Sequence, residues 1–433
     1  MLLRLEDLIE WIDTIARAEF PDLDFLDPNG VLEVPTGFDD AVRVRMELPG
    51  TEYLHLASVY VDCDREALRS SERAASSVWK GYGERLAEAD VINPDFIGTG
   101  FHTKKDHNPW FEIRFAEPTQ VRRVVVRNRN NRTSHRALGL QVRVLRADGR
   151  WATIYDCAER HANFAKSVER IFGSVTDLTA QDGKRSDVIT ASGLARILTK
   201  VYQRDYGPSL VRSLNQMDLS PASRAKFREA TSSRVLKGRE LEWTSHGVRR
   251  SFRFWSNGEK RQYVAHACDV VEDLQGLTKN VCFGFGSVLA AVRDGDLIPH
   301  DDDLDIIVGF EPNEAPKIPD GLRVIERYLR KKGYQVIGDN AGHRQVIRRP
   351  NKKVDVFVGV FEKDSIDWLP GHRGLLERQM IFPPKSIEFF GSCYPIPADP
   401  HRYLELVYGA NWRVPDPHYK HSGSRQEFAD LIR

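Results

Sequence analysis

The sequence lacks two features that would place the protein in a membrane or outside the cell. None of its hydrophobic segments approaches the roughly 20 apolar residues that a membrane-spanning helix requires. Its five cysteines are dispersed and odd in number, which argues against a disulfide framework or a zinc cluster. We therefore expect a cytoplasmic protein without a transmembrane segment, for which peripheral association with a membrane stays open.

The sequence also lacks an excess of charge of either sign. It has 63 basic and 62 acidic residues, which leaves a net charge of +1. Because no overall basic field would attract nucleic acid, we expect no nucleic-acid partner. With 433 residues, 41% of them hydrophobic, the chain is long enough for about two or three domains. Nothing in the composition indicates an oligomeric state.

Changes of pattern along the chain predict four segments. Residues 1–35 are typical of an amphipathic N-terminal helix followed by a turn region. Residues 36–165 contain short alternating segments split by Gly, Pro and Asp, which predict an antiparallel β-sandwich. Apolar residues at helical spacing in 166–255 predict a helical linker or the start of the next domain. Residues 256–433 form that next domain.

Part of the sandwich segment resembles the discoidin (coagulation factor type C) and galactose-binding-like modules. The landmarks are Trp110 in one strand pattern, Asn128 and Arg129 at the end of the next, and Arg136, Gly139 and Leu140 before a third. The resemblance implies a jelly-roll sandwich that holds a ligand with loops at one end. The candidate loops are 98–108 and 128–135. Their polar residues could bind a glycan, contact the second domain, or simply be solvated.

The second domain is organised around residues 281–308. Gly286 and Ser287 form a turn before a short apolar segment, and Asp303 and Asp305 precede a buried strand pattern. Because alternate side chains of a strand share a face, the two carboxylates would project together. They would repel each other unless a cation such as Mg²⁺, or Mn²⁺ in its place, lay between them. The alternative is a solvated acidic loop. If the metal site exists, we expect Asp303 and Asp305 to face the metal and Asp301 and Asp302 to shape the turn.

A further carboxylate, Asp355, stands alone in the apolar strand pattern of residues 352–361. An uncompensated carboxylate is costly to bury. A neighbouring Lys or Arg could pair with it. If this strand lies beside residues 306–308, however, Asp355 would be the third ligand of the same metal, and we favour this explanation because it covers both acidic features.

The order of these features resembles the layout of the polymerase-β-type nucleotidyltransferase fold, an α+β domain with a mixed sheet flanked by helices. Residues 285–308 are similar to the signature of the LicD/fukutin family, and residues 354–357 and 396–415 match its later blocks. The departures from the family pattern are Ser287 for Thr, Ala290 for Gly and His300 for Trp. The residues kept in the first block are Gly286, Leu289, Ala291, Val292, Arg293, Ile298, Pro299, Asp301, Asp302, Asp303 and Asp305.

The LicD/fukutin resemblance implies an Mg²⁺-dependent phosphotransferase. Members move a phospho-alcohol, such as phosphocholine, ribitol phosphate or glycerol phosphate, from a CDP-linked donor to a glycan acceptor. It implies Asp303, Asp305 and Asp355 as the catalytic and metal-binding carboxylates, with Asp355 either the third ligand or the base for the acceptor proton. Two alternatives stay open: a nucleotidyltransferase that moves NMP, and a lectin-like protein with an inactive transferase domain. The three carboxylates count against the second.

The resemblance also implies residues around the metal. Gly286, Ser287 and Arg293 are the candidates for binding the donor phosphate, and for Arg293 a salt bridge to the acidic run is the alternative. The candidates for contacting the donor or the acceptor are His300, Arg344 and Trp412. The sequence names neither the alcohol nor the acceptor sugar.

Overall fold

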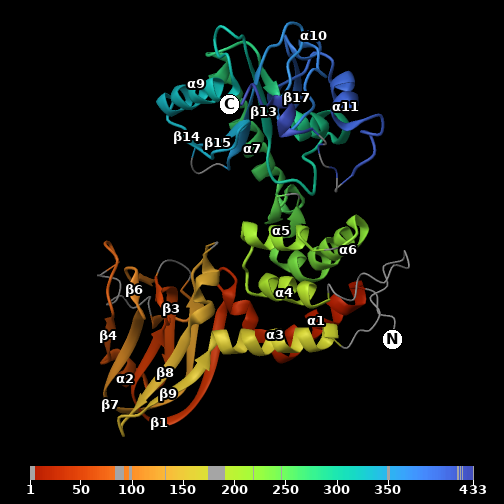
Figure 1. The fold of residues 1–433 in the computed structure, drawn as a ribbon. Helices are drawn as coiled ribbons and strands as arrows, with labels where there is room; N and C mark the ends of the chain where they lie inside the picture. Colours follow the sequence, from red (N-terminus) through yellow and green to blue (C-terminus); the bar gives the residue numbers. More distant parts are fainter. Residues whose placement is uncertain are drawn as a thin grey trace. The chain divides into compact units, whose positions relative to one another are not determined.

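The protein divides into two compact units, Met1–Val235 (unit 1) and Leu236–Arg433 (unit 2) (Figure 1). The computed structural model describes residues 5–82, 92–96, 100–131, 133–173, 191–217, 219–244, 246–348, 352–416, 419, 421 and 423–432. Each unit has a hydrophobic core of its own. This division does not test the four segment boundaries that the sequence suggests, and they stay a prediction. None of the helices in the described part of the chain has the length and apolar character needed to span a membrane.

Unit 1 contains an antiparallel sheet domain, as predicted for the segment that follows the N-terminal helix. The strand order is β5-β3-β7-β1-β8-β9, with β4 also paired to β7. The strands are β1 (Val31–Glu47), β2 (Thr51–Glu52), β3 (His55–Asp62), β4 (Glu72–Ala75), β5 (Phe101–His102), β6 (Asp106–His107), β7 (Trp110–Asn128), β8 (Gln141–Arg146) and β9 (Trp151–Asp156).

The two long strands β1 and β7 build both halves of this domain. They pair along their whole length, with register shifts between Pro35 and Arg43. Strand β4 pairs with the first part of β7 and β3 with its last part, so one long strand serves two groups of partners. The alternation of β1 explains its fold: Val44 and Met46 enter the core, whereas Arg45 lies on the opposite face.

Trp110 lies on this opposite face, outside the core. The Arg45 guanidinium carbon is 4.6 Å from the ring centroid of Trp110 and 4.6 Å from that of Trp151. The same guanidinium donates to the buried carboxylate of Glu112, with Nε 2.8 Å from Oε2. Trp110 therefore stabilises an arginine stack on the outer surface of the sheet.

The helices of unit 1 pack beside the strands. They are α1 (Leu5–Glu19), η1 (Pro21–Leu26), α2 (Arg65–Arg69), η4 (Ser134–Gly139), α3 (Cys157–Gly173), α4 (Ala191–Tyr202), α5 (Pro208–Asn215), α6 (Pro221–Thr231), η6 (Ser232–Leu236) and η7 (Lys237–Arg239). Helix α3 begins inside the segment predicted as sandwich. Ser220 caps α6, because its hydroxyl accepts a hydrogen bond from Ser223 N.

Unit 2 is built on a five-stranded mixed sheet with the order β12-β13-β16-β15-β14, in which β13 and β16 are parallel. Its strands are β10 (Glu242–Thr244), β11 (Gly247–Arg249), β12 (Val281–Phe283), β13 (Asp305–Phe310), β14 (Gln335–Ile337), β15 (His343–Ile347), β16 (Val354–Val360), β17 (Lys385–Phe389) and β18 (Ser392–Ile396). The mixed sheet with helices that the sequence predicted is confirmed.

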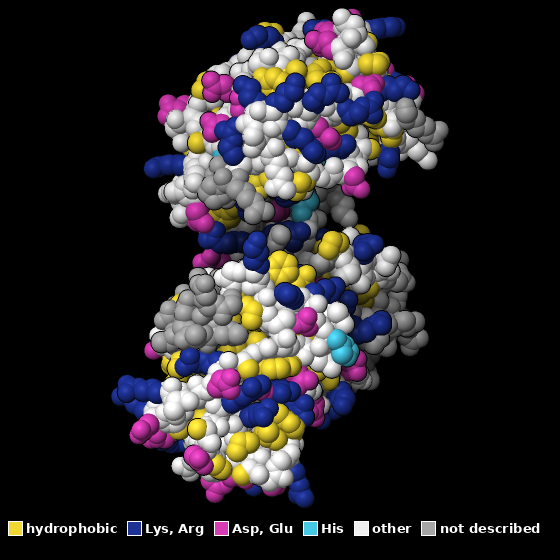
Figure 2. Space-filling view, turned by 90° about the vertical axis from the view of Figure 1, so that its left-hand side faces the viewer, with side chains coloured by type: hydrophobic (Ala, Val, Ile, Leu, Met, Phe, Trp, Pro, Cys, Tyr) yellow, Lys and Arg dark blue, Asp and Glu magenta, His cyan; other side chains and the backbone are white. Residues whose placement is uncertain are grey.

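Helices flank this sheet. They are η8 (Phe252–Phe254), α7 (Asn257–Gln275), α8 (Phe285–Leu289), η9 (Ala290–Asp294), α9 (Ile318–Lys331), α10 (Arg378–Ile381), α11 (Pro400–Tyr408) and η10 (Arg425–Phe428). Helix α7 starts with a capping box formed by Ser256 and Glu259. Helix α9 buries one apolar stripe against the sheet, and its exposed face carries Arg323, Arg327, Arg330 and Lys331. Several Lys and Arg side chains gather on this side of unit 2 in Figure 2.

Candidate metal and phosphate site

Strands β13 and β16 bring two acidic residues to the same edge of the sheet. They run parallel, and Asp305 of β13 is the register partner of Asp355 of β16. The condition on which the sequence prediction depended, that the two strands are neighbours, is therefore met. Asp303 lies two residues before β13 and is buried. Three carboxylates consequently meet where the two parallel strands begin.

Backbone hydrogen bonds fix the start of β13. Ser287 Oγ accepts from Asp305 N at 2.7 Å, and Gly284 N donates to Asp305 O at 3.0 Å. On the other side, Asp355 N donates to Leu304 O at 2.9 Å. The Ser287 side chain is 1% exposed. The structure thus places its hydroxyl on the backbone of Asp305, where it positions that carboxylate.

The acidic residues line a cavity of about 850 Å³. Of the residues that the sequence singled out, the cavity lining includes Gly286, Arg293, His300, Asp303, Asp305, Asp355 and Trp412. Ser287 and Arg344 are not among the described lining residues. The rest of the wall mixes aliphatic and polar side chains with the rings of Phe285, Phe357, Tyr408, Tyr419 and His421. A carboxylate cluster beside flat apolar faces suits a ligand that has both a charged and an aromatic part.

The carboxylates of this cluster are buried close together, which disfavours their ionised forms. Burial, with repulsion from its neighbours, raises the pKa of Asp303 to about 6 and that of Asp301 to about 7. Burial raises the pKa of Asp305 well above its usual value for the same reasons, and burial also raises that of Asp355. A bound divalent cation would favour the ionised forms and offset this cost.

Asp355 tests whether the donor set fits a cation. Its buried Oδ1 accepts no hydrogen bond from the described residues. The nearest cation is Lys353, whose Nζ lies 3.7 Å from Oδ1, and His343 Nε2 lies 3.4 Å from Oδ2. A buried carboxylate oxygen without a donor is costly. Three carboxylates, one with a free oxygen, are the hard ligands that Mg²⁺ takes.

The positively charged candidates differ in their placement. Arg293 lines the cavity, where its Nε and Nη2 donate to the Asp294 carboxylate at 2.7 and 2.8 Å. The structure therefore pairs it with its chain neighbour. Arg344 forms an ion pair with Glu326 and also donates to backbone carbonyls, outside the cavity lining.

The other two candidates for substrate contact lie in the cavity wall and differ in burial. Trp412 is almost fully buried, and the Arg413 guanidinium carbon lies 4.3 Å from its ring centroid. His300 is partly buried, and burial lowers the pKa of its imidazole.

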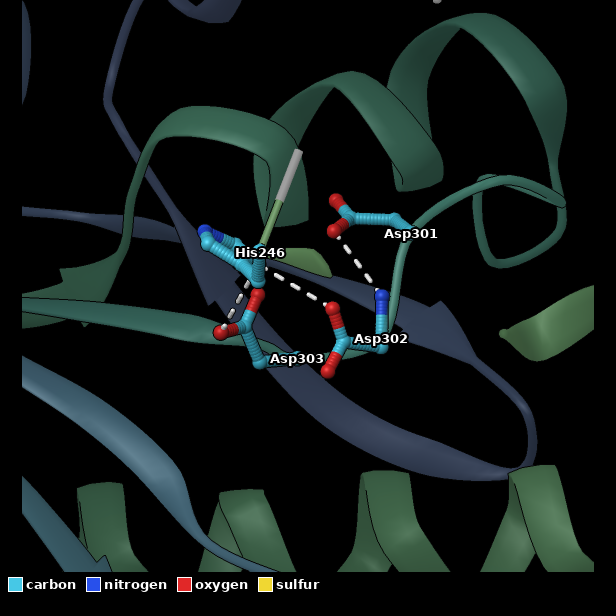
Figure 3. A group of neighbouring side chains, drawn as sticks. All are labelled: His246, Asp301, Asp302 and Asp303. Atoms are coloured by element: carbon cyan, nitrogen blue, oxygen red, sulfur yellow. Dashed lines mark hydrogen bonds and ion pairs between the residues drawn. The ribbon is translucent and has the colours of Figure 1, made fainter. Parts of the chain in front are cut away.

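The sequence did not identify His246, which comes from the turn between β10 and β11. Its Nδ1 lies 3.0 Å from Asp302 Oδ1 and 3.7 Å from Asp303 Oδ2 (Figure 3). The hydrogen bond to Asp302 raises the pKa of His246 to about 10. Burial acts against ionisation of Asp302, but His246 and nearby cations hold its pKa below the usual value. No spacing motif connects this histidine with the acidic run.

Asp301 was assigned to the turn, and it has a second place in the cavity wall. Its carboxylate accepts from Asp302 N at 2.9 Å, which shapes the turn as expected. The same carboxylate lines the cavity, and a Cβ added at Gly286 would lie 3.1 Å from its Oδ2. Glycine at position 286 thus keeps the backbone close to the acidic cluster.

The sequence of residues 279–399 matches the model of the LicD/FKTN/FKRP nucleotidyltransferase domain. Residues 93–177 match that of the NedA-like galactose-binding domain of the F5/F8 type C group. The chain carries a LicD-type nucleotidyltransferase domain. Both resemblances seen in the sequence are thereby confirmed, and the LicD match supports a phosphotransferase-type role in glycan modification.

The LicD-type match ends before part of the cavity wall. It includes the three carboxylates, whereas His246 precedes it and Trp412 follows it. No curated protein matches the chain. Among solved structures, ANT(2″)-Ia in complex with adenylyl-2″-tobramycin is 13% identical, with 36% of this chain and 79% of that chain covered. The TM-score of 0.24 is too low to establish a shared fold.

Proposed function

We propose that the protein is an Mg²⁺-dependent phosphotransferase that moves a phospho-alcohol from a CDP-linked donor to a glycan hydroxyl. The observation that carries this proposal is the pairing of Asp305 with Asp355 across two parallel strands, with Asp303 beside them in one cavity. These three carboxylates lie in the LicD-type domain, and the family resemblance implies substrates of this class. The proposal names a class of donor and acceptor, and it leaves the particular alcohol open.

In this proposal Asp303, Asp305 and Asp355 hold the metal ion. The bound ion would neutralise charge on the donor diphosphate and on the leaving group. The chain's own part is to present the carboxylates from one rigid sheet edge, where Ser287 and backbone hydrogen bonds fix Asp305.

The remaining cavity wall suits the nucleotide. Aromatic side chains such as Tyr408 and Trp412 offer flat faces for a base and exclude water from the diphosphate. Arg293 lies in the wall with its charge already paired to Asp294. To contact the donor phosphate, its guanidinium would either leave Asp294 or bind Asp294 and the phosphate together.

A product analysis tests the proposal. The full chain is incubated with Mg²⁺, glycan acceptors and separate CDP-choline, CDP-ribitol, CDP-glycerol and nucleoside triphosphate donors, and the products are weighed by mass spectrometry. We expect CMP release together with a glycan that has gained the mass of one phospho-alcohol. Pyrophosphate release with a nucleotidylated acceptor would contradict the phospho-alcohol reaction and support nucleotidyl transfer.

A further inference from the structure

The β10–β11 hairpin and the segment after it are bonded to the acidic turn. Phe252 N donates to Asp301 O at 2.8 Å, and Arg253 N donates to Pro299 O at 2.8 Å. The two donors, Phe252 and Arg253, precede the LicD-type match, which begins at residue 279. The backbone on which Asp301, Asp302 and Asp303 stand is thus held by a segment outside the matched domain.

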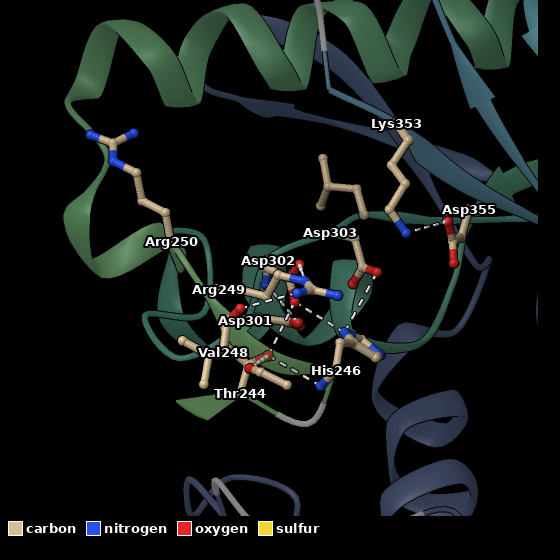
Figure 4. Close-up of polar contacts among 12 residues, drawn as sticks. Thr244, His246, Val248, Arg249, Arg250, Asp301, Asp302, Asp303, Lys353 and Asp355 are labelled. Atoms are coloured by element: carbon tan, nitrogen blue, oxygen red, sulfur yellow. Dashed lines mark hydrogen bonds and ion pairs between the residues drawn. The ribbon is translucent and has the colours of Figure 1, made fainter. Parts of the chain in front are cut away.

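Asp302 is the polar centre of this contact, and it is engaged on the side of the hairpin. Its Oδ1 lies 3.4 Å from Thr244 Oγ1 and 3.0 Å from His246 Nδ1, and its Oδ2 lies 4.0 Å from Arg249 Nε (Figure 4). Lys352 Nζ donates to the carbonyl oxygen of Asp302 at 3.2 Å. With so many partners, Asp302 serves to anchor the hairpin and its histidine.

His246 extends from that anchor to the proposed metal ligands. Its backbone N donates to Thr244 Oγ1 at 3.1 Å, which fixes the turn from which it projects. Nδ1 faces both Asp302 and Asp303, at 3.0 and 3.7 Å. The side chain is 51% exposed and lines the cavity. One ring edge is therefore bound to the anchor while the ring itself borders the space for a ligand.

We propose that His246 is a positioning residue that holds the Asp303 carboxylate in the orientation needed for metal binding. Bonded to Asp302 Oδ1, Nδ1 lies at ion-pair distance from Asp303 Oδ2, 3.7 Å, and would attract that oxygen toward the hairpin, so that Asp303 Oδ1 stays available to a cation. Partners of this kind orient the ligands of metal sites, and their removal lowers metal affinity. The inference rests on the proposed function, because it assumes that Asp303 binds the metal.

Two substitutions separate the ring nitrogens. In His246→Asn the amide nitrogen occupies about the position of Nδ1, whereas in His246→Gln it occupies about that of Nε2. A residue that acts through Nδ1 is rescued by Asn and not by Gln. His246→Ala removes both nitrogens. Because the side chain is half exposed, we expect all three variants to fold, which thermal unfolding checks.

The experiment measures Mn²⁺ binding by the full chain through the electron paramagnetic resonance signal of the free ion. We expect His246→Ala and His246→Gln to raise the Kd for Mn²⁺ roughly 10- to 100-fold, and His246→Asn to stay within about threefold of wild type. In transfer assays the KM for Mg²⁺ should rise more than kcat falls. The control is His372→Ala, because His372 Nδ1 also faces a carboxylate, 3.4 Å from Glu427 Oε1, outside the lining of the large cavity.

The outcomes are distinguishable. If wild type binds Mn²⁺ and His246→Ala binds it with the same Kd, the positioning role is overturned and the metal site stands. Rescue by Gln in place of Asn overturns the role of Nδ1. If wild type binds no Mn²⁺, the proposed metal site is overturned, and the inference about His246 with it.

Discussion

At the scale of single residues, the site holds three mutually repelling carboxylates where two strands begin. Asp303, Asp305 and Asp355 are held near one another by the backbone of β13 and β16, and burial raises the pKa of each. A stable fold gains nothing from this arrangement by itself, since isolated buried carboxylates cost free energy. Such clusters of shifted pKa values are typical of functional sites.

Asp305→Asn should separate function from stability. We expect transfer activity to fall on the order of a thousandfold, because the proposed metal site would lose one ligand and its charge. In metal-free buffer the melting temperature should stay equal or rise, because one repelling charge is removed. Added Mg²⁺ should stabilise wild type and not the variant.

Asp320→Asn is the matched control for this substitution. Asp320 lies in α9, is paired with Arg323 and is absent from the described cavity lining. It should keep both the activity and the stabilisation by Mg²⁺. Near-normal transfer by Asp305→Asn would contradict the assignment of the metal site.

His161 should make unit 1 sensitive to acid. Its side chain is 1% exposed, neither ring nitrogen has a hydrogen-bond partner among the described residues, and burial lowers its pKa to about 4. Between pH 6.5 and 4 the imidazole of His161 binds a proton in the unfolded chain but stays neutral in the folded protein. The free energy of unfolding therefore falls as the pH falls through this window. The loss should be about 2 kcal/mol at pH 5 relative to pH 7.5.

The variant His161→Leu should remove this part of the acid sensitivity. The urea midpoint at pH 7.5 and at pH 5.0 measures it, and exposed His107→Leu serves as the control. An unchanged difference between the two pH values in His161→Leu would show that other groups cause the acid sensitivity.

At the scale of elements, close contact between α9 and the sheet sets the position of β16. Gly321 lies on the buried face of α9, where an added Cβ would come within 2.6 Å of Val358 Cγ1 and 2.9 Å of Phe310 Cδ2. Both neighbours belong to β13 and β16, the strands that carry the paired carboxylates Asp305 and Asp355 near their beginnings. A glycine is thus needed here for packing, against its low helix propensity.

Gly321→Ala should lower the free energy of unfolding by about 1–3 kcal/mol, because overpacking outweighs the gain in helix propensity. Gly258→Ala in α7 is the matched control, since its added Cβ would meet nothing closer than Ser256 Oγ at 3.9 Å. It should stabilise by about 0.5 kcal/mol. Chemical unfolding measures the change in the free energy of unfolding for both variants. A change in the same direction for both would contradict the packing argument.

At the scale of the molecule, the two units have separate cores, and each contains one of the two matched domains. Residues 93–177 lie in unit 1, and residues 279–399 lie in unit 2. The polar contacts of the acidic turn extend back to β10 in unit 2, well before the LicD-type match. The candidate site of unit 2 therefore extends beyond the segment recognised by sequence similarity.

Two fragments test this extension. A fragment of residues 236–433 should unfold cooperatively and be stabilised by Mg²⁺, because it keeps the core and the hairpin. A fragment of residues 256–433 lacks Thr244, His246 and the buried Phe252. It should be less stable and should lose the stabilisation by Mg²⁺, as measured by thermal unfolding. Equal behaviour of the two fragments would show that the hairpin is dispensable.

Local patterns determined the type of each domain. The alternation in β1 and β7 predicted antiparallel strands, and the apolar runs around Asp305 and Asp355 predicted buried strands. Both predictions rest on the pattern of neighbouring residues. The acidic run and the Gly-Ser turn likewise pointed to a phosphate-handling site. Sequence signals of this kind need no knowledge of distant partners.

Long-range pairing was decided only by the tertiary structure. The register that sets Asp305 beside Asp355, the placement of Ser287 Oγ on Asp305 N, and the ion pair that holds Arg344 on Glu326 all join segments far apart in the chain. The same holds for His246, which reaches Asp303 from a hairpin with no recognisable motif. Residue spacing carries no information about such contacts, because packing of the whole unit brings these side chains together.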